Sequence, residues 1–104
     1  MKNPLVLTAL SLACVAAPAA EVVVTTKDKA FSAKAVTVKV GDKITFKNED
    51  PFSHNVFSLS EPGSFDLGTY AKGETRSTVV QDAGVHEIEC AIHPEMKLIV
   101  TVQK

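Results

Sequence analysis

Several features that define large functional classes are missing from this chain. The 11 lysines and arginines are scattered among 12 aspartates and glutamates, so no basic block could follow a phosphate backbone, and the charge pattern argues against nucleic-acid binding. No apolar run reaches the length needed to span a bilayer. Low-complexity tracts and internal repeats are also absent, and 104 residues with 45% apolar composition predict a single small globular domain.

The amino-terminal residues have the pattern of a secretory signal. Residues 1–3 form a short positive head, residues 4–17 are apolar, and residues 17–19 offer an Ala-x-Ala cleavage site. The apolar stretch is too short to cross a bilayer as a membrane anchor. We therefore expect a signal peptide at residues 1–19 and an exported, soluble mature domain at residues 20–104, with cleavage after Ala19 or one residue later.

Cysteine is scarce, and the two cysteines differ in their expected fate. Cys14 lies within the expected signal, in a context that partly resembles a bacterial lipoprotein site, where the cysteine becomes the lipidated first residue. The apolar stretch before it is short and the later Ala-x-Ala site is the better processing signal, so we expect Cys14 to be removed. Cys90 is then the only cysteine of the mature protein. An unpaired thiol in an oxidising compartment needs protection, either by a metal or by burial as an inert apolar residue.

The residues after Cys90 carry the clearest chemical signal. Cys90, His93 and Met96 follow one another at three-residue intervals, and a second imidazole, His54, lies about 35 residues upstream. One thiolate, two imidazoles and a weakly held thioether are the ligand set of a blue-copper electron-transfer centre. A structural zinc site would normally have cysteine, histidine or carboxylate in place of the methionine, because a thioether is a poor zinc ligand. The motif therefore favours copper over zinc.

Short runs of alternating apolar and polar residues, with no helical period, make up the rest of the chain. Strands are expected at residues 22–26, 36–40, 43–47, 54–59, 75–80, 85–90 and 98–102. Turn signals occur at residues 48–51, 61–63, 72–74 and 82–84. Gly41-Asp42 is expected to close a hairpin, and residues 60–70 are interpreted as a loop with a short strand. Seven to eight strands at this spacing predict an all-β sandwich with Greek-key connections.

At the level of motifs, residues 31–102 resemble the small cupredoxins of the plastocyanin, pseudoazurin and amicyanin group. The short spacing from Cys90 to Met96 is typical of amicyanin, as is the proline that directly follows His93. Residues 65–68, Phe-Asp-Leu-Gly, together with the cysteine loop, are similar to small periplasmic cupredoxin-like proteins of the methylamine-utilisation type.

This resemblance implies a cupredoxin-like Greek-key β-sandwich with one type 1 copper per chain. It makes His54 and His93 the imidazole ligands, Cys90 the thiolate ligand and Met96 the long axial ligand. Asn55 corresponds to the asparagine that, in this family, links the strand of the first histidine to the cysteine loop, and its side chain has donors for a backbone carbonyl or the thiolate. The alternative is that Asn55 is an ordinary residue at a strand edge.

The function implied is that of a periplasmic one-electron carrier, monomeric, between redox partners such as a c-type cytochrome and a periplasmic dehydrogenase. Enzymatic activity is not expected, because four protein ligands leave no open position for a substrate. One alternative is a copper delivery or buffering module with the same ligands, although such carriers more often have several methionines or histidines. Another is a metal-free sandwich that serves as an adhesion or structural module.

Two residues near the motif depart from the usual cupredoxin pattern. Alternation places His86 on the same strand face as Cys90, but four residues and roughly 13 Å away, so packing or a structural hydrogen bond is favoured over ligation. Glu95 lies inside the ligand loop, where a docking surface should be mostly apolar. It is either a solvated carboxylate or, together with Glu87 and Glu89, a group that steers docking toward a basic partner.

Overall fold

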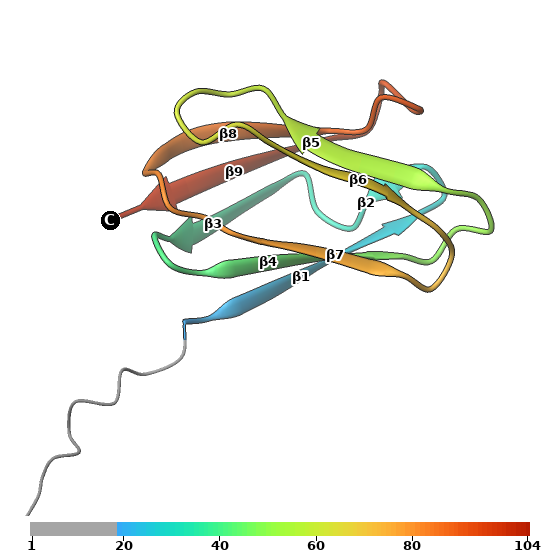
Figure 1. The fold of residues 1–104 in the computed structure, drawn as a ribbon, viewed down its shortest axis with the longest axis horizontal. Coiled ribbons are helices and arrows are strands. Elements are labelled where there is room, and N and C mark those ends of the chain that lie inside the picture. Colours follow the sequence, from blue (N-terminus) through green and yellow to red (C-terminus); the bar gives the residue numbers. More distant parts are fainter. Residues whose placement is uncertain (1–18) are drawn as a thin grey trace, which may run out of the picture.

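In the described part of the chain, nine strands of the computed structural model form two sheets that pack face to face (Figure 1). The structure describes residues 19–104, so the expected signal peptide, including Cys14, lies outside the described residues. The strands are β1 (Glu21–Lys27), β2 (Ala30–Phe31), β3 (Ala35–Lys39), β4 (Lys43–Asn48), β5 (His54–Ser58), β6 (Phe65–Tyr70), β7 (Thr75–Val79), β8 (Gly84–Glu89) and β9 (Lys97–Gln103). The all-β prediction is confirmed.

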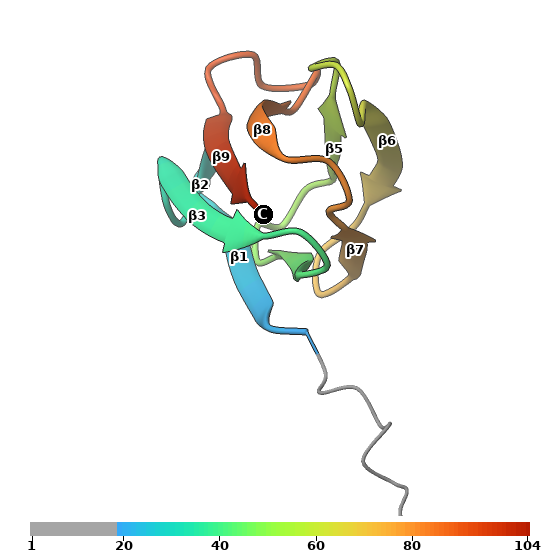
Figure 2. The same cartoon turned by 90° about the vertical axis from the view of Figure 1, so that its left-hand side faces the viewer.

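The strands divide into a four-stranded sheet, in the order β2-β1-β4-β7, and a five-stranded sheet, in the order β3-β9-β8-β5-β6. Figure 2 shows the five-stranded sheet curving over the four-stranded one. The pairs β1–β4 and β3–β9 are parallel and the other pairs are antiparallel. The count exceeds the expected seven to eight because β2 has only two residues, too few to show alternation in a sequence.

The expected hairpin across Gly41-Asp42 is wrong. The turn itself forms, since Gly41 has a φ of 95° and the Asp42 carboxylate accepts a hydrogen bond from the backbone N–H of Lys39. It carries the chain from one sheet to the other, however, because β3 pairs with β9 while β4 pairs with β1 and β7. The buried side chains of the two strands, Val38 on β3 and Phe46 on β4 among them, therefore lie in the two facing sheets. Alternation and turn residues alone do not distinguish these two topologies.

The core lies between the sheets and is built from the inward residue of each alternating pair. Phe46, Val56, Leu98 and Val100 are fully buried, and Phe46 packs edge-on against Phe31 with ring centroids 6.0 Å apart. Burying each such side chain contributes about 1.5–3 kcal/mol relative to leaving it exposed. This packed frame holds the strand ends that carry the expected ligands.

The connection between β8 and β9 projects at one end of the sandwich, at the opposite end from the carboxyl terminus (Figure 1). It contains the cysteine motif, and the two strands that flank it are paired from Gly84↔Val102 to Glu89↔Lys97. The continuous hydrogen-bond ladder between β8 and β9 therefore fixes where this loop begins and ends. Among the described residues, no helix has the length and apolar character required to cross a membrane.

Candidate metal centre

Three of the residues expected to bind metal converge at this end of the molecule. The donor atoms of His54, Cys90 and His93 all lie within 4.8 Å of one another. The Nδ1 atoms of the two imidazoles are 3.2 Å apart, and the sulfur of Cys90 is 3.8 Å from Nδ1 of His54. With metal–nitrogen bonds of about 2.0 Å and metal–sulfur bonds of about 2.3 Å, these separations allow the three donors to share one ion.

Each of the expected ligands is placed by a different part of the sandwich. His54 is the first residue of β5, Cys90 directly follows β8, and Met96 directly precedes β9. His54, Cys90 and Met96 are buried, whereas His93 in the loop is half-buried. The backbone N–H of Met96 donates to the carbonyl of His93 at 2.9 Å, which closes a tight turn between them. Three of the four expected donors are thus buried, and His93 is the one that reaches the surface.

Asn55 connects the first histidine to the cysteine loop, but through different atoms from those expected. Its backbone N–H points at the sulfur of Cys90 at 3.5 Å, and its side-chain oxygen accepts the N–H of Ala91 at 2.8 Å. The side chain is therefore an acceptor from the loop, and the donor to the sulfur is the backbone of β5. A hydrogen bond to a thiolate sulfur stabilises its charge and tunes the potential of a metal bound to it.

Asp50 is a further residue of the site that the sequence interpretation treated only as part of a turn. Its carboxylate oxygen Oδ2 lies 2.6 Å from Nε2 of His54, and the Asp50 side chain is only 3% exposed. Because Nδ1 of His54 faces the other donor atoms, Nε2 carries the proton and donates it to the carboxylate. An aspartate four residues before an expected ligand histidine, in a segment with many turn residues, was the signal that could have identified it.

The electrostatic environment of Asp50 favours its charged form. Burial by itself would raise the pKa of Asp50. The hydrogen bond from His54 and those from the backbone N–H groups of Lys29 and Asp28 outweigh burial, so the pKa of Asp50 lies below its ordinary value. An ionised carboxylate fixes the orientation of the His54 ring and makes it a more basic ligand.

Phe52 covers the outer side of the two imidazoles and was also missed. Its ring centroid lies 5.3 Å from that of His54 and 5.4 Å from that of His93. Phe52 is 38% exposed and Ile92, next to His93 in the loop, is 50% exposed. An aromatic and an aliphatic side chain are therefore exposed beside His93, the one converging residue that reaches solvent.

The arrangement of fold and donors agrees with comparison to known proteins. A family profile described as "Cupredoxin-like domain" matches residues 4–102. The chain belongs to the cupredoxin-like family. The chain is 34% identical over 93 residues to the methylamine utilization protein MauL of Methylorubrum extorquens, covering 86% of this chain and 82% of that protein.

Solved structures support the same assignment. A reduced variant of amicyanin superposes with a TM-score of 0.73 at 28% identity, covering 88% of each chain. The purple cupredoxin of Nitrosopumilus maritimus superposes with a TM-score of 0.70 at 22% identity, covering 79% of this chain and 99% of that one, and this likeness concerns the fold alone. The resemblance to small cupredoxins is thus confirmed, and the His/Cys/His/Met set of this cupredoxin is consistent with a type 1 copper site.

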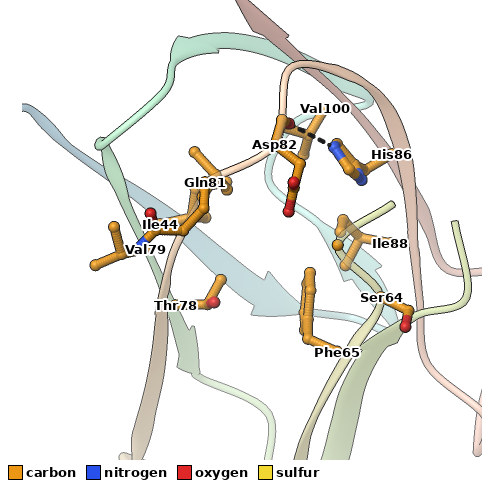
Figure 3. A pocket seen from close by; sticks show the side chains of 12 residues that line it. Ile44, Ser64, Phe65, Thr78, Val79, Gln81, Asp82, His86, Ile88 and Val100 are labelled. Carbon is orange, nitrogen blue, oxygen red and sulfur yellow. Dashed lines mark hydrogen bonds between the residues drawn. The ribbon is translucent and has the colours of Figure 1, made fainter. Parts of the chain in front are cut away.

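His86, the third histidine of the cupredoxin, lies apart from the three converging donors. It is 6% exposed and lines a pocket of about 210 Å³ with residues that include Ile44, Phe65 and Ile88 (Figure 3). Its Nε2 donates to the backbone carbonyl of Asp82 at 3.0 Å, while Nδ1 has no partner within residues 19–104. The structure thus gives His86 the packing and hydrogen-bonding role that alternation predicts.

Proposed function

We propose that this cupredoxin binds one type 1 copper through His54, Cys90, His93 and Met96 and acts as a one-electron carrier. The observation that supports this most is the convergence of a buried cysteine sulfur with two imidazoles within 4.8 Å, at one end of a cupredoxin sandwich. Soft sulfur suits Cu(I) and imidazole suits both oxidation states, so copper bound there would cycle between the two.

The protein's own residues contribute a site that changes little between oxidation states. His54 is held by Asp50, the backbone of Asn55 donates toward the Cys90 sulfur, and the ladder between β8 and β9 fixes the ends of the loop. Such a frame limits rearrangement when an electron arrives or leaves. The half-buried edge of His93 is the proposed route for electrons, because it is the donor nearest to solvent.

A carrier role is favoured over catalysis because four protein donors leave no open position for a substrate. It is also favoured over the alternative of copper delivery or buffering. A delivery protein must release its metal, whereas the buried Cys90, His54 and Met96 surround the proposed ion with protein, and Phe52 covers the imidazoles. Rapid metal exchange through such a site would require the loop to open.

The proposed setting is the periplasm, reached through the signal peptide at residues 1–19. We propose protein redox partners, a c-type cytochrome or a periplasmic dehydrogenase, which the monomer meets through the apolar surface around His93. The similarity to amicyanin and to a methylamine utilization protein supports a partner in amine oxidation. Glu95, exposed in the ligand loop, and the half-exposed Glu89 of β8 are the acidic groups available to steer a basic partner, whereas the Glu87 carboxylate is paired with Lys97 at 3.7 Å.

Two kinetic measurements on the copper-loaded mature domain separate the two roles. A carrier should show fast, reversible voltammetry and should lose copper to a strong Cu(I) chelator only over hours. A delivery module should give up its copper within minutes and exchange electrons slowly. Copper loss within minutes together with slow electron exchange would rule out the carrier proposal. The matched variant is Phe52→Ala, which should speed copper loss if the Phe52 ring is what retains the metal.

A further inference from the structure

The turn between β1 and β2 has a backbone conformation that its residues do not favour. Lys27 pairs with Ala30, so Asp28 and Lys29 form a two-residue loop. Asp28 has a φ of 54° and Lys29 a φ of 59°, the left-handed values that a type I′ turn requires at both positions. Asn-Gly is the usual pair there, because side chains other than glycine adopt this region at a cost. The chain tolerates the strain at both positions.

Both backbone N–H groups of this turn are directed at one buried carboxylate. The N–H of Asp28 donates to Oδ1 of Asp50 at 2.6 Å, and the N–H of Lys29 donates to Oδ2 at 3.1 Å. Consecutive N–H groups in such a turn form a concave site for an anion. The turn therefore supplies two of the three hydrogen bonds that the Asp50 side chain accepts, and the third comes from His54.

Two of the three donors to Asp50 meet on the same oxygen atom. Oδ2 accepts both the N–H of Lys29 and the Nε2 proton of His54. The position of the turn thus sets the position of the oxygen that orients the His54 ring. Figure 1 shows the β1–β2 turn at the same end of the sandwich as the β8–β9 loop.

We propose that the Asp28-Lys29 turn is a positioning element of the metal centre, acting on His54 through Asp50 without touching any ligand. The inference rests on the proposed copper site. The two turn N–H groups withdraw negative charge from the carboxylate, which weakens its pull on the His54 proton. Without them the imidazole becomes a more basic ligand, which favours Cu(II) and lowers the reduction potential.

The test compares two turn variants that both lack the Lys29 side chain. D28N/K29G introduces the favoured type I′ pair and keeps both N–H groups, so the potential should stay at the wild-type value. D28P/K29G removes the first N–H and forces φ at position 28 to a negative value. It should shift the Cu(II)/Cu(I) equilibrium toward Cu(II) by up to about tenfold, a fall of about 59 mV for one electron.

Two further measurements make the result specific to the proposed route. In the Asp50→Ala background, which leaves no side-chain oxygen between the turn and His54, D28P/K29G should add no further change in potential. In metal-free protein, the NMR resonance of the His54 Nε2 proton should move in D28P/K29G and stay in place in D28N/K29G. This second readout needs no copper, so it tests the turn even if the protein proves not to bind copper.

The inference is overturned by a folded D28P/K29G that keeps the wild-type potential and the wild-type His54 proton resonance. It is equally overturned by a shift in potential of the same size with and without Asp50. If D28P/K29G does not fold, a backbone ester at Lys29, which removes only that N–H and leaves the side chain, takes its place. The same fall in potential is then expected, and an unchanged potential contradicts the proposal.

Discussion

Neutralising Asp50 tests how strongly the protein matrix holds the first histidine. In the wild type the carboxylate accepts hydrogen bonds from His54 and from the backbone N–H groups of Asp28 and Lys29, and the side chain is 3% exposed. The amide of Asp50→Asn has one acceptor oxygen, and its NH₂ group must face either the histidine proton or the turn. At least one buried donor then loses its acceptor, and each such loss costs about 1–3 kcal/mol.

The expected loss of stability in Asp50→Asn is therefore roughly 3 kcal/mol at neutral pH, once the weaker neutral hydrogen bonds are included. For a domain of this size that lowers the midpoint of thermal unfolding by more than about 10 °C. The loss of negative charge beside His54 should also raise the reduction potential, because a less basic imidazole stabilises Cu(II) less. Calorimetry of the metal-free protein and voltammetry of the copper form measure the two effects separately.

The stability difference between wild type and Asp50→Asn should also depend on pH, in a direction set by the lowered pKa of Asp50. The pKa of Asp50 is lowered in the folded protein, so its contribution to stability is fully present above the unfolded pKa of about 3.9 and is lost as the pH falls through the folded pKa. The difference in unfolding free energy between metal-free wild type and Asp50→Asn should shrink below about pH 4. A difference under about 0.5 kcal/mol at pH 7, with an unchanged potential, would refute the assigned role of Asp50.

Three other substitutions have distinct expected outcomes. Met96→Leu should raise the potential and keep the colour, because the lost thioether stabilises Cu(II) more than Cu(I). Met96→Gln, which adds a harder oxygen donor, should lower the potential. Shifts in the opposite directions, measured by voltammetry, would exclude an axial role for Met96. His86→Phe should keep full copper content and an unchanged visible spectrum, since His86 bonds only the carbonyl of Asp82; a metal analysis showing copper loss would contradict this. Tyr70→Phe removes the 2.7 Å hydrogen bond to Thr26 and should lower the free energy of unfolding by about 1 kcal/mol, measured by urea titration, with the potential unchanged.

The residues that converge at the candidate site could be named from sequence, because residue type and local spacing indicate metal-binding chemistry. Cys90, His93 and Met96 lie within one short loop, and few metals suit that set. Most strands were also predictable, since β4 and β9 bury every second residue. The short strand β2 was missed because it has two residues and depends on its pairing with β1.

What the sequence could not predict depends on contacts between distant segments. The Gly41-Asp42 turn has the same residues whether it closes a hairpin or crosses between sheets, and only the pairing of β3 with β9 decides. Asp50 looks like an ordinary turn residue until the β1–β2 turn and His54 are seen to meet on its carboxylate. For Asn55, sequence identifies the residue but not which of its atoms donates and which accepts.

The central claim is that Cys90 and its neighbours hold copper, and the metal content and visible spectrum of the purified mature domain test it most directly. Protein from copper-supplemented cells should contain one copper per chain and show an intense visible band when oxidised, because thiolate-to-Cu(II) charge transfer requires Cys90 as a ligand. The band should vanish on addition of one electron per copper, and it should be absent from Cys90→Ala. A wild-type protein without copper, or a Cys90→Ala variant that keeps the band, would contradict the account.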